Sequence, residues 1–309
     1  MPDSRPWDAA NLAAPARLAV RQAFQVAEAV NASIDLVCVL PEASAGFFGS
    51  EEDAAKEVET DKAEAEAVLA DLTQQYAQIF GETKTDSTIV FGRPWLEILK
   101  IAGTDRDNLI LCGTREQGAV SRLLFGSTGL KLLRNAPCPV WLVKPRIDDD
   151  ADIDILAATD LSEVGEDVLE IGVTLGQTLP VRLSVLHAVD DDLNRHMART
   201  GASEEELASH RKKAHQAAEE KLHGQLSMTD FRTVEQGVKV QIAEGPADSC
   251  ILSAIEELDI DLLIMATAGR GGIPGMLFGN TAERLLSQLP CSILALKPDD
   301  FKCPVELES

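Results

Sequence analysis

The sequence predicts an α/β protein made of two tandem, doubly wound domains, each with a parallel sheet. Two observations lead to this prediction. The chain repeats itself at a constant spacing, and within each repeat short apolar runs of strand length alternate with longer helical stretches. Strands that are apolar throughout and alternate with helices are typical of a parallel sheet covered on both faces.

The repeat is clear in the sequence itself. LLFGSTGLKLLRNAPCPVWLVKP (123–145) aligns without a gap on MLFGNTAERLLSQLPCSILALKP (276–298), so that Phe125 pairs with Phe278 and Lys144 with Lys297, 153 positions apart. The same offset pairs NLILCGT (108–114) with DLLIMAT (261–267), and Gly92 with Gly245. A constant offset over so long a stretch indicates duplicated domains, because the period is too long for a solenoid.

A polar segment separates the two copies. RIDDDADID (146–154) carries five aspartates and lies between two apolar strand-like runs. We therefore expect a first domain over 1–148, a second over 152–298 and a C-terminal tail over 299–309. Each half is about 150 residues, a usual domain size.

The second half gives the order of elements. Strands are predicted at 153–160, 181–189, 238–245, 261–267 and 291–297, with helices at 203–226 and 247–258 between them. Ligands of such open sheets bind at the carboxyl ends of the strands, where the winding order reverses. This rule places Asp160, Val189 and the loop 268–279 on one rim.

The amino-acid composition excludes some classes of binding partner. The net charge is −23 with a pI near 4.5, which disfavours binding to nucleic acid and to anionic membranes. No apolar run reaches the length of about 18 residues that a membrane span needs, and the N-terminus has no secretory pattern. We expect a cytoplasmic protein whose six cysteines, which include no C-x-x-C pair, are reduced structural thiols.

A glycine-rich loop precedes the last helix. TAGRGGIPGMLFGNTAE (267–283) holds five glycines, which would let backbone amides approach a phosphate closely. Asn280 is a plausible N-cap, and Glu283 would complete a capping box, with Ala282, Leu285, Leu286 and Leu289 as the buried stripe. A helix is thus expected here whether or not an anion binds. Neither a Walker motif nor a G-x-G-x-x-G fingerprint is present, so phosphate would be held by amides and by the hydroxyls of Thr267 and Thr281, helped by Arg270.

The duplicated units resemble the universal stress proteins, specifically their tandem E-type members. The resemblance is carried by ATDLS (158–162), the glycine loop, GNTAE (279–283), CSILALKP (291–298) and the tail PDDFKCPVELES (298–309), and it covers nearly all of the chain. It implies Rossmann-like domains of the adenine nucleotide alpha hydrolase type. It also implies that the final strands of the two domains pair and form an internal pseudo-dimer.

The resemblance also implies a nucleotide site in the second half. Asp160 would meet the ribose or adenine side, Val189 would flank the base, and Asn280 and Thr281 would meet the phosphates. Gly269 and Gly279 match the second and third glycines of the family's G-2x-G-9x-G-[ST/N] motif, whereas Ala266 replaces the first. The full set of expected ligand-binding residues is Thr159, Asp160, Leu161, Val189, Thr267, Gly269, Arg270, Gly272, Gly279, Asn280 and Thr281.

The first half departs further from the family pattern. Glu116 stands where the second motif glycine should be, and a carboxylate about 4 Å from a phosphate charge costs roughly 4 kcal/mol at an effective dielectric near 20. MPDSRPWDAANLAAPARLAVRQAF runs almost directly into a helix, with no counterpart of IDILAATD and only Asp8 as a remnant of its aspartate. Either the chain is shortened relative to the family, or the first half is a structural partner with a shortened sheet. We expect it to bind no nucleotide.

Three functions remain open at this point. The leading one is a stress-response sensor that binds ATP, AMP or a related small ligand in the second domain only, with Mg²⁺ accompanying ATP. The second is a scaffold or partner-binding protein without a nucleotide. The third, a slow ATPase, is disfavoured because the sequence shows no catalytic base or metal-binding carboxylate cluster, and we assign no catalytic or metal-binding residue. The partners expected are a nucleotide and, as an open alternative, further copies of the chain as a homo-oligomer.

Overall fold

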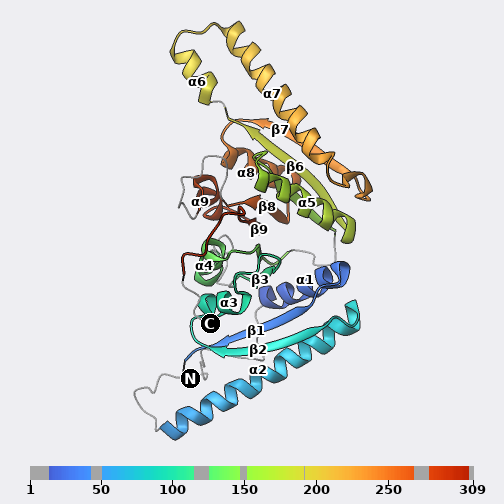
Figure 1. Cartoon of the computed structure of the whole chain (residues 1–309), viewed down its shortest axis with the longest axis vertical. Helices are drawn as coiled ribbons and strands as arrows, with labels where there is room; N and C mark the ends of the chain where they lie inside the picture. The colour runs from blue at the N-terminus through green and yellow to red at the C-terminus, as the bar shows by residue number, and fades with distance from the viewer. Residues whose placement is uncertain are drawn as a thin grey trace.

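The computed structural model describes residues 14–42, 51–114, 125–146, 152–190, 192–267 and 278–305. The two halves of the chain contribute successive series of helices and strands (Figure 1). The first half contains α1 (Ala14–Val30), β1 (Ile34–Leu40), α2 (Glu51–Phe80), β2 (Thr85–Phe91), α3 (Pro94–Ala102), β3 (Ile110–Gly113), α4 (Ser127–Asn135) and β4 (Val140–Val143).

The second half begins with a strand, β5, whereas the first element described in the first half is a helix. Its elements are β5 (Ile153–Ala158), α5 (Glu163–Thr178), β6 (Val181–Val189), α6 (Asp192–Arg199), α7 (Glu204–Leu226), the 3-10 turn η2 (Phe231–Thr233), β7 (Val238–Glu244), α8 (Ala247–Leu258), β8 (Leu262–Ala266), α9 (Asn280–Leu286) and β9 (Ser292–Leu296). The predicted strands and helices of this half are all present, with ends that differ by one or two residues.

Seven strands form one sheet in the order β3-β4-β9-β8-β5-β6-β7. Within the second half all pairs are parallel, and the chain winds outward from β5 in both directions, to β6 and β7 on one side and to β8 and β9 on the other. This confirms the doubly wound prediction. The space between the carboxyl ends of β5 and β8 is where the winding order reverses.

The two halves are joined by β4 and β9, which pair antiparallel. Val140 faces Ala295, Leu142 faces Ile293, and Trp141 faces Leu294. Because Val140 corresponds to Ile293 and Leu142 to Ala295 in the repeat, the contact has an internal two-fold symmetry with Trp141 and Leu294 at its axis. The expected internal pseudo-dimer is confirmed.

The sheet of the first half is divided in two. β1 and β2 form a separate parallel pair, while β3 and β4 belong to the large sheet. In the second half β5 lies between the corresponding strands, β6 and β8. The predicted absence of a first strand in the first half concerns residues 1–13, which lie outside the described residues. The separation of β1 and β2 from the large sheet is an additional finding.

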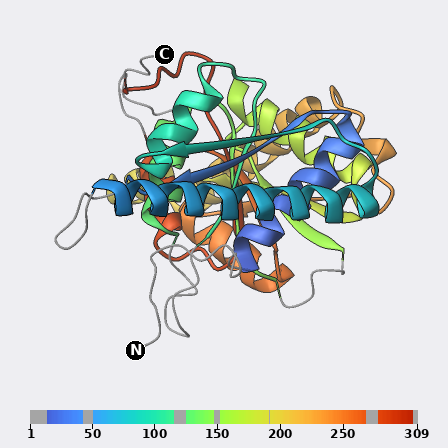
Figure 2. The ribbon, with the colours of Figure 1, turned by 90° about the horizontal axis from the view of Figure 1, so that it is seen from below.

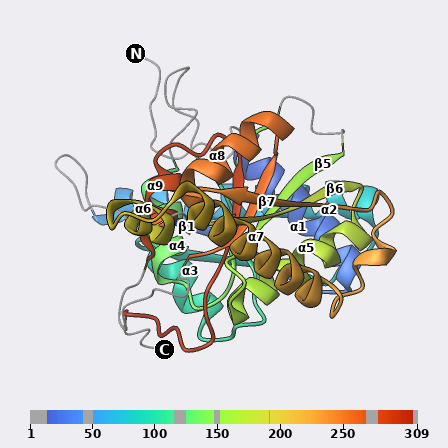
Figure 3. The same cartoon turned by 90° about the horizontal axis from the view of Figure 1, so that it is seen from above.

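Helix α1 connects the small sheet to the large one. Leu18 and Ala19 belong to the core that contains Trp141 and Val143 of β4, while Phe24 of the same helix packs among side chains of β1 and α2. α2 lies across β1 and β2 at one end of the molecule, as the view from below shows (Figure 2). At the opposite end α7 crosses α5, β6 and β7 (Figure 3).

Two buried lysines follow the joining strands. The Nζ atom of Lys144 lies 4.3 Å from the centre of the Phe125 ring and donates a hydrogen bond to the carbonyl of Leu289. Its counterpart Lys297 lies 5.2 Å from the ring of Phe278 and 4.6 Å from that of Phe301. Burial lowers the pKa of Lys144 to about 8 and that of Lys297 to about 7.

The lowered pKa values predict a pH-dependent stability. Unfolded lysine, with its usual pKa of about 10.4, binds a proton that folded Lys297 has released above pH 7, so the free energy of unfolding should rise with pH. For one lysine the slope approaches about 1.4 kcal/mol per pH unit. Urea unfolding between pH 6.5 and 8 measures the slope, and comparison with a lysine variant cancels the contribution of the cysteines, whose pKa in the unfolded chain is about 8.5. Lys297→Met should flatten the slope, and an equal slope in both proteins would contradict this explanation.

Gly165 of α5 packs closely against the residues that follow β5. Alanine substitutions at this glycine and at a glycine without close neighbours should therefore change the stability in opposite directions. A Cβ on Gly165 would lie 2.5 Å from Oγ1 of Thr159 and 3.0 Å from Oδ1 of Asp160, so Gly165→Ala should destabilise the fold by about 1–3 kcal/mol. The control is Gly224→Ala in α7, where no atom lies within 4 Å and the higher helix propensity of alanine should stabilise by up to about 1 kcal/mol. Urea unfolding at one pH compares the two; equal stabilities would argue against the close contact.

Candidate functional site

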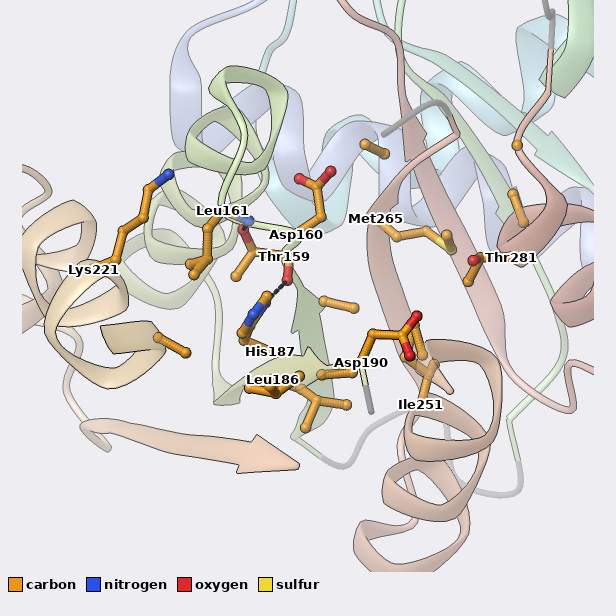
Figure 4. A pocket seen from close by; sticks show the side chains of 18 of the residues that line it. Thr159, Asp160, Leu161, Leu186, His187, Asp190, Lys221, Ile251, Met265 and Thr281 are labelled. Atoms are coloured by element: carbon orange, nitrogen blue, oxygen red, sulfur yellow. Dashed lines mark hydrogen bonds between the residues drawn. The ribbon is translucent and has the colours of Figure 1, made fainter. Parts of the chain in front are cut away.

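A cavity of about 840 Å³ opens at the carboxyl ends of β5, β6 and β8 (Figure 4). It lies at the switch point of the sheet, where the fold class predicts a ligand. Helices α7, α8 and α9 close its sides. The lining residues are Ala158, Thr159, Asp160, Leu161, Leu186, His187, Ala188, Val189, Asp190, Ala214, Ala217, Ala218, Lys221, Ala247, Ile251, Met265, Ala266, Thr267, Gly279, Asn280, Thr281 and Ala282.

Most of the residues expected from the sequence meet in this cavity. Eight of them line it: Thr159, Asp160, Leu161, Val189, Thr267, Gly279, Asn280 and Thr281. They come from four separate parts of the second half, so the fold brings them together across more than a hundred positions of sequence. Gly269, Arg270 and Gly272 lie outside the described residues, and their roles stay predictions.

The turn after β5 holds Asp160 at the cavity. The buried Thr159 hydroxyl donates to the carbonyl of Gly165 at 3.2 Å and accepts the N–H of Leu161 at 3.0 Å. Leu161 has a φ of 61°, a left-handed conformation that redirects the chain into α5. Oδ1 of Asp160 accepts hydrogen bonds from the N–H and the hydroxyl of Ser162, the N-cap of α5. The carboxylate is therefore fixed by the start of the following helix.

His187 is a cavity residue that the predicted site omitted. Its Nδ1 atom lies 2.8 Å from the carbonyl oxygen of Thr159. A carbonyl can only accept, so Nδ1 carries the hydrogen in this contact, which sets the tautomer of a neutral ring and leaves Nε2 as an acceptor. The imidazole thus ties β6 to the turn that holds Asp160, as the dashed line in Figure 4 shows.

Helix α7 contributes a wall of the cavity that the expected ligand-binding residues did not include. Ala214, Ala217, Ala218 and Lys221 line the cavity, at helical spacings of three and four residues. Three alanines on one stripe of an otherwise charged helix are the signal that could have identified this face. Figure 4 shows Lys221 on the opposite side of the cavity from Thr281, with the carboxylates of Asp160 and Asp190 between them.

The apolar part of the cavity is built from three elements. Leu186 of β6, Ile251 of α8 and Met265 of β8 are each at most 5% exposed. Apolar walls with a few polar groups that converge on them are typical of small-molecule sites. The cavity can therefore hold a flat, partly apolar group beside hydrogen-bonding partners for a polar one.

The structure corrects the expected start of the last helix. The N-cap of α9 is Gly279, one residue earlier than predicted, and no side chain caps the helix. The predicted capping box of Asn280 and Glu283 is wrong, because the N-cap residue Gly279 has no side chain that could accept a hydrogen bond. Glu283 forms an ion pair with Arg134 of α4 at 3.4 Å. Ala282, Leu285, Leu286 and Leu289 are buried as expected.

Thr267 and Ala266 have structural roles at the end of β8. The hydroxyl of Thr267 donates to the carbonyl of Leu296 at 3.2 Å, and its own carbonyl accepts the N–H of Gly279 at 2.7 Å. This geometry favours Thr281 over Thr267 as the hydroxyl available to a ligand. Ala266 is the last residue of β8 and is not among the residues with positive φ, so alanine is unstrained where the family motif has its first glycine.

The described part of the chain has no group of three or more His, Cys, Asp or Glu side chains that could hold a metal ion. Within those same residues, no helix combines the length and the apolar character that crossing a membrane requires.

The six cysteines are all free thiols, and burial raises the pKa of Cys112 and Cys138 to about 11.

Comparison with known proteins gives matches over both halves. The model of the universal stress protein family matches residues 11–144 and again residues 154–297. Universal stress protein E of Photorhabdus laumondii is 28% identical over 221 residues, which cover 69% of each chain. Universal stress protein E of Escherichia coli K12 is 25% identical over 221 residues, covering 70% of this chain and 69% of the relative.

Solved structures agree on the fold. A universal stress protein from Archaeoglobus fulgidus aligns with a TM-score of 0.59 at 18% identity and covers 93% of this chain and 96% of its own. A protein of unknown function from Pseudomonas aeruginosa PAO1 has a TM-score of 0.59 at 22% identity, with 90% and 95% covered. Two family matches in one chain, the internal repeat and this shared fold lead to one conclusion: the chain belongs to the universal stress protein family, as a tandem member with two family units.

Proposed function

We propose that this stress-response protein is a cytoplasmic sensor that binds an adenine nucleotide, ATP or AMP, in the cavity of its second half. The observation that carries the proposal is the convergence of Asp160, Val189, Asn280 and Thr281 on one cavity at the switch point of the sheet. The family supports the stress-response role, and its members are generally not enzymes.

The cavity offers a separate group for each part of a nucleotide. The apolar side chains of Leu186, Ile251 and Met265 suit the adenine ring, beside the end of β6 at Val189. The fixed carboxylate of Asp160 is suited to accept the hydroxyl hydrogens of a ribose. The phosphates would lie towards Asn280 and Thr281, and Mg²⁺ brought with ATP would be held mainly by phosphate oxygens and water.

Binding would change the protein through the walls that meet at the cavity. The residues that line the cavity come from β5, β6, β8, α7, α8 and α9. A bound nucleotide would therefore contact several of these elements at once and connect the opposite walls of the cavity. A ligand stabilises whichever arrangement it contacts best, and that differential contact is all that a sensor needs. No bond has to break in the nucleotide for this to happen.

A matched pair of variants tests the site. Gly279 and Gly126 are equivalent N-cap residues with similar extended conformations, φ −74° and ψ 152° against φ −63° and ψ 160°. Both positions therefore accept a side chain without backbone strain. Gly279→Glu should weaken ATP binding about a thousandfold, because a carboxylate about 4 Å from a phosphate costs roughly 4 kcal/mol. Gly126→Glu should leave the affinity unchanged.

Titration calorimetry with ATP and with AMP measures binding, and phosphate release is followed in the same samples. We expect one saturable site per chain. Absence of heat from the wild-type protein at millimolar nucleotide would favour the scaffold function. Loss of binding in the Gly126 variant alone would move the site to the first half, and phosphate release in proportion to protein would make the protein an ATPase. Urea unfolding of both variants controls for loss of fold.

A further inference from the structure

One wall of the larger cavity carries a positive charge that the proposed nucleotide contacts leave unused. Lys221 of α7 is the only lysine or arginine among the described residues that line this cavity. Within the described part of the chain, its ammonium group forms no hydrogen bond and no ion pair. In a chain with 51 acidic residues against 28 lysines and arginines, a cation that faces a cavity without a partner indicates an anionic ligand.

The packing of α7 places Lys221 at this wall. Leu222, the next residue, is fully buried in the core, and Ala218, one turn earlier, is 7% exposed. These contacts fix the rotation of the helix, so that Ala214, Ala217 and Lys221 face the cavity at spacings of three and four residues. The small alanine side chains leave the space in front of Lys221 open to a ligand.

The charged groups of the cavity lie in a definite order. In Figure 4, Lys221 lies on one side, Thr281 on the opposite side, and the carboxylates of Asp160 and Asp190 between them. Like charges repel, so the centre of the cavity disfavours an anionic group. Hydroxyl groups suit the centre instead, because the fixed carboxylate of Asp160 accepts hydrogen bonds. A ligand that uses the whole cavity therefore has a neutral, hydroxyl-bearing middle and an anionic group at each end.

A nucleotide with two separated phosphates has this order of groups. In the proposed binding mode, the 5′ phosphates lie towards Asn280 and Thr281, and a ribose hydroxyl donates to Asp160. Ribose has two hydroxyls, on the neighbouring carbons 2′ and 3′. When one of them donates to Asp160, the other can carry a phosphate that extends past the carboxylate to Lys221. The adenine ring keeps its place against the apolar wall.

Given the proposed nucleotide site, on which this inference rests, we propose that the preferred ligand is an adenine nucleotide with a second phosphate on its 2′ or 3′ oxygen. Lys221 binds this phosphate and determines the preference. A charge-assisted contact between an ammonium group and a phosphate is stronger than a contact between neutral groups. The lysine stem is flexible, so the ammonium group can follow a phosphate on either oxygen. AMP and ATP have a hydroxyl at this place and do not gain the contact.

Titration calorimetry with three ligands tests the preference. AMP, adenosine 2′,5′-bisphosphate and adenosine 3′,5′-bisphosphate are each titrated into the whole chain. We expect one of the two bisphosphates to bind about tenfold more tightly than AMP at low ionic strength. The advantage should fall as salt is added, because Lys221 is exposed to solvent. The bisphosphate that binds more tightly identifies the oxygen that carries the phosphate.

Variants of two lysines on the same helix make the test specific. Lys221→Gln removes the charge and keeps a polar side chain, so the ratio of the bisphosphate and AMP affinities should fall from about ten to about one. Lys221→Arg keeps the charge and should restore most of the ratio. The matched control is Lys212→Gln, because Lys212 is exposed on α7 and does not line the cavity. This variant should keep the ratio of the wild type.

The possible failures are distinguishable. If neither AMP nor a bisphosphate binds, the proposed function itself is wrong. If AMP binds and neither bisphosphate binds more tightly, the nucleotide site stands and the role of Lys221 is wrong. Equal weakening of AMP and bisphosphate binding in Lys221→Gln would place the 5′ phosphate at this lysine, and weakening of ATP binding alone would place the terminal phosphate of ATP there. Either result would overturn the assignment of Lys221 to a 2′ or 3′ phosphate.

Discussion

The antiparallel pairing of β4 with β9 is the contact on which the rest of the molecule depends. It covers two apolar edges that would otherwise be exposed to other chains. It also gives β3 and β4, which are only a two-stranded fragment of the first half, a place in a seven-stranded sheet. α1 packs on this fragment and on β1, so the small sheet is held in place through the same junction.

The cavity at the carboxyl ends of the strands depends on a short turn after β5 whose polar groups form hydrogen bonds with one another. Thr159, Asp160 and Ser162 form hydrogen bonds within the turn and with the start of α5. The strand can therefore end abruptly and still present the Asp160 carboxylate to the cavity. The corresponding cavity of the first half is smaller, about 260 Å³ against about 840 Å³, and no described residue of α2 lines it. The turn after β5 and helix α7 both contribute to the size of the larger cavity.

Much of this could be predicted from the sequence, since strand periodicity and a constant offset are properties of local residues. What escaped prediction depends on contacts between distant elements. The capping box at Asn280 is absent because the N-cap is Gly279, whose N–H donates to the Thr267 carbonyl at the end of β8 and which has no side chain. The alanine stripe of α7 was hidden by the charges around it, and His187 gained its role only when β6 placed it beside the Thr159 carbonyl. The close contact of the first turn of α1 with Gly113 could not be predicted either, because it joins two elements nearly a hundred residues apart.

The residues at the internal two-fold axis show what covalent duplication allows. In a dimer of identical chains, the residue on the axis faces its own copy, so it must be compatible with itself. Here Trp141 faces Leu294, a large ring against a smaller branched side chain. Each member of the pair can change without the same change opposite it. Gene fusion thus releases the interface from the constraint of self-complementarity, and the two halves are free to diverge in sequence while they remain in contact.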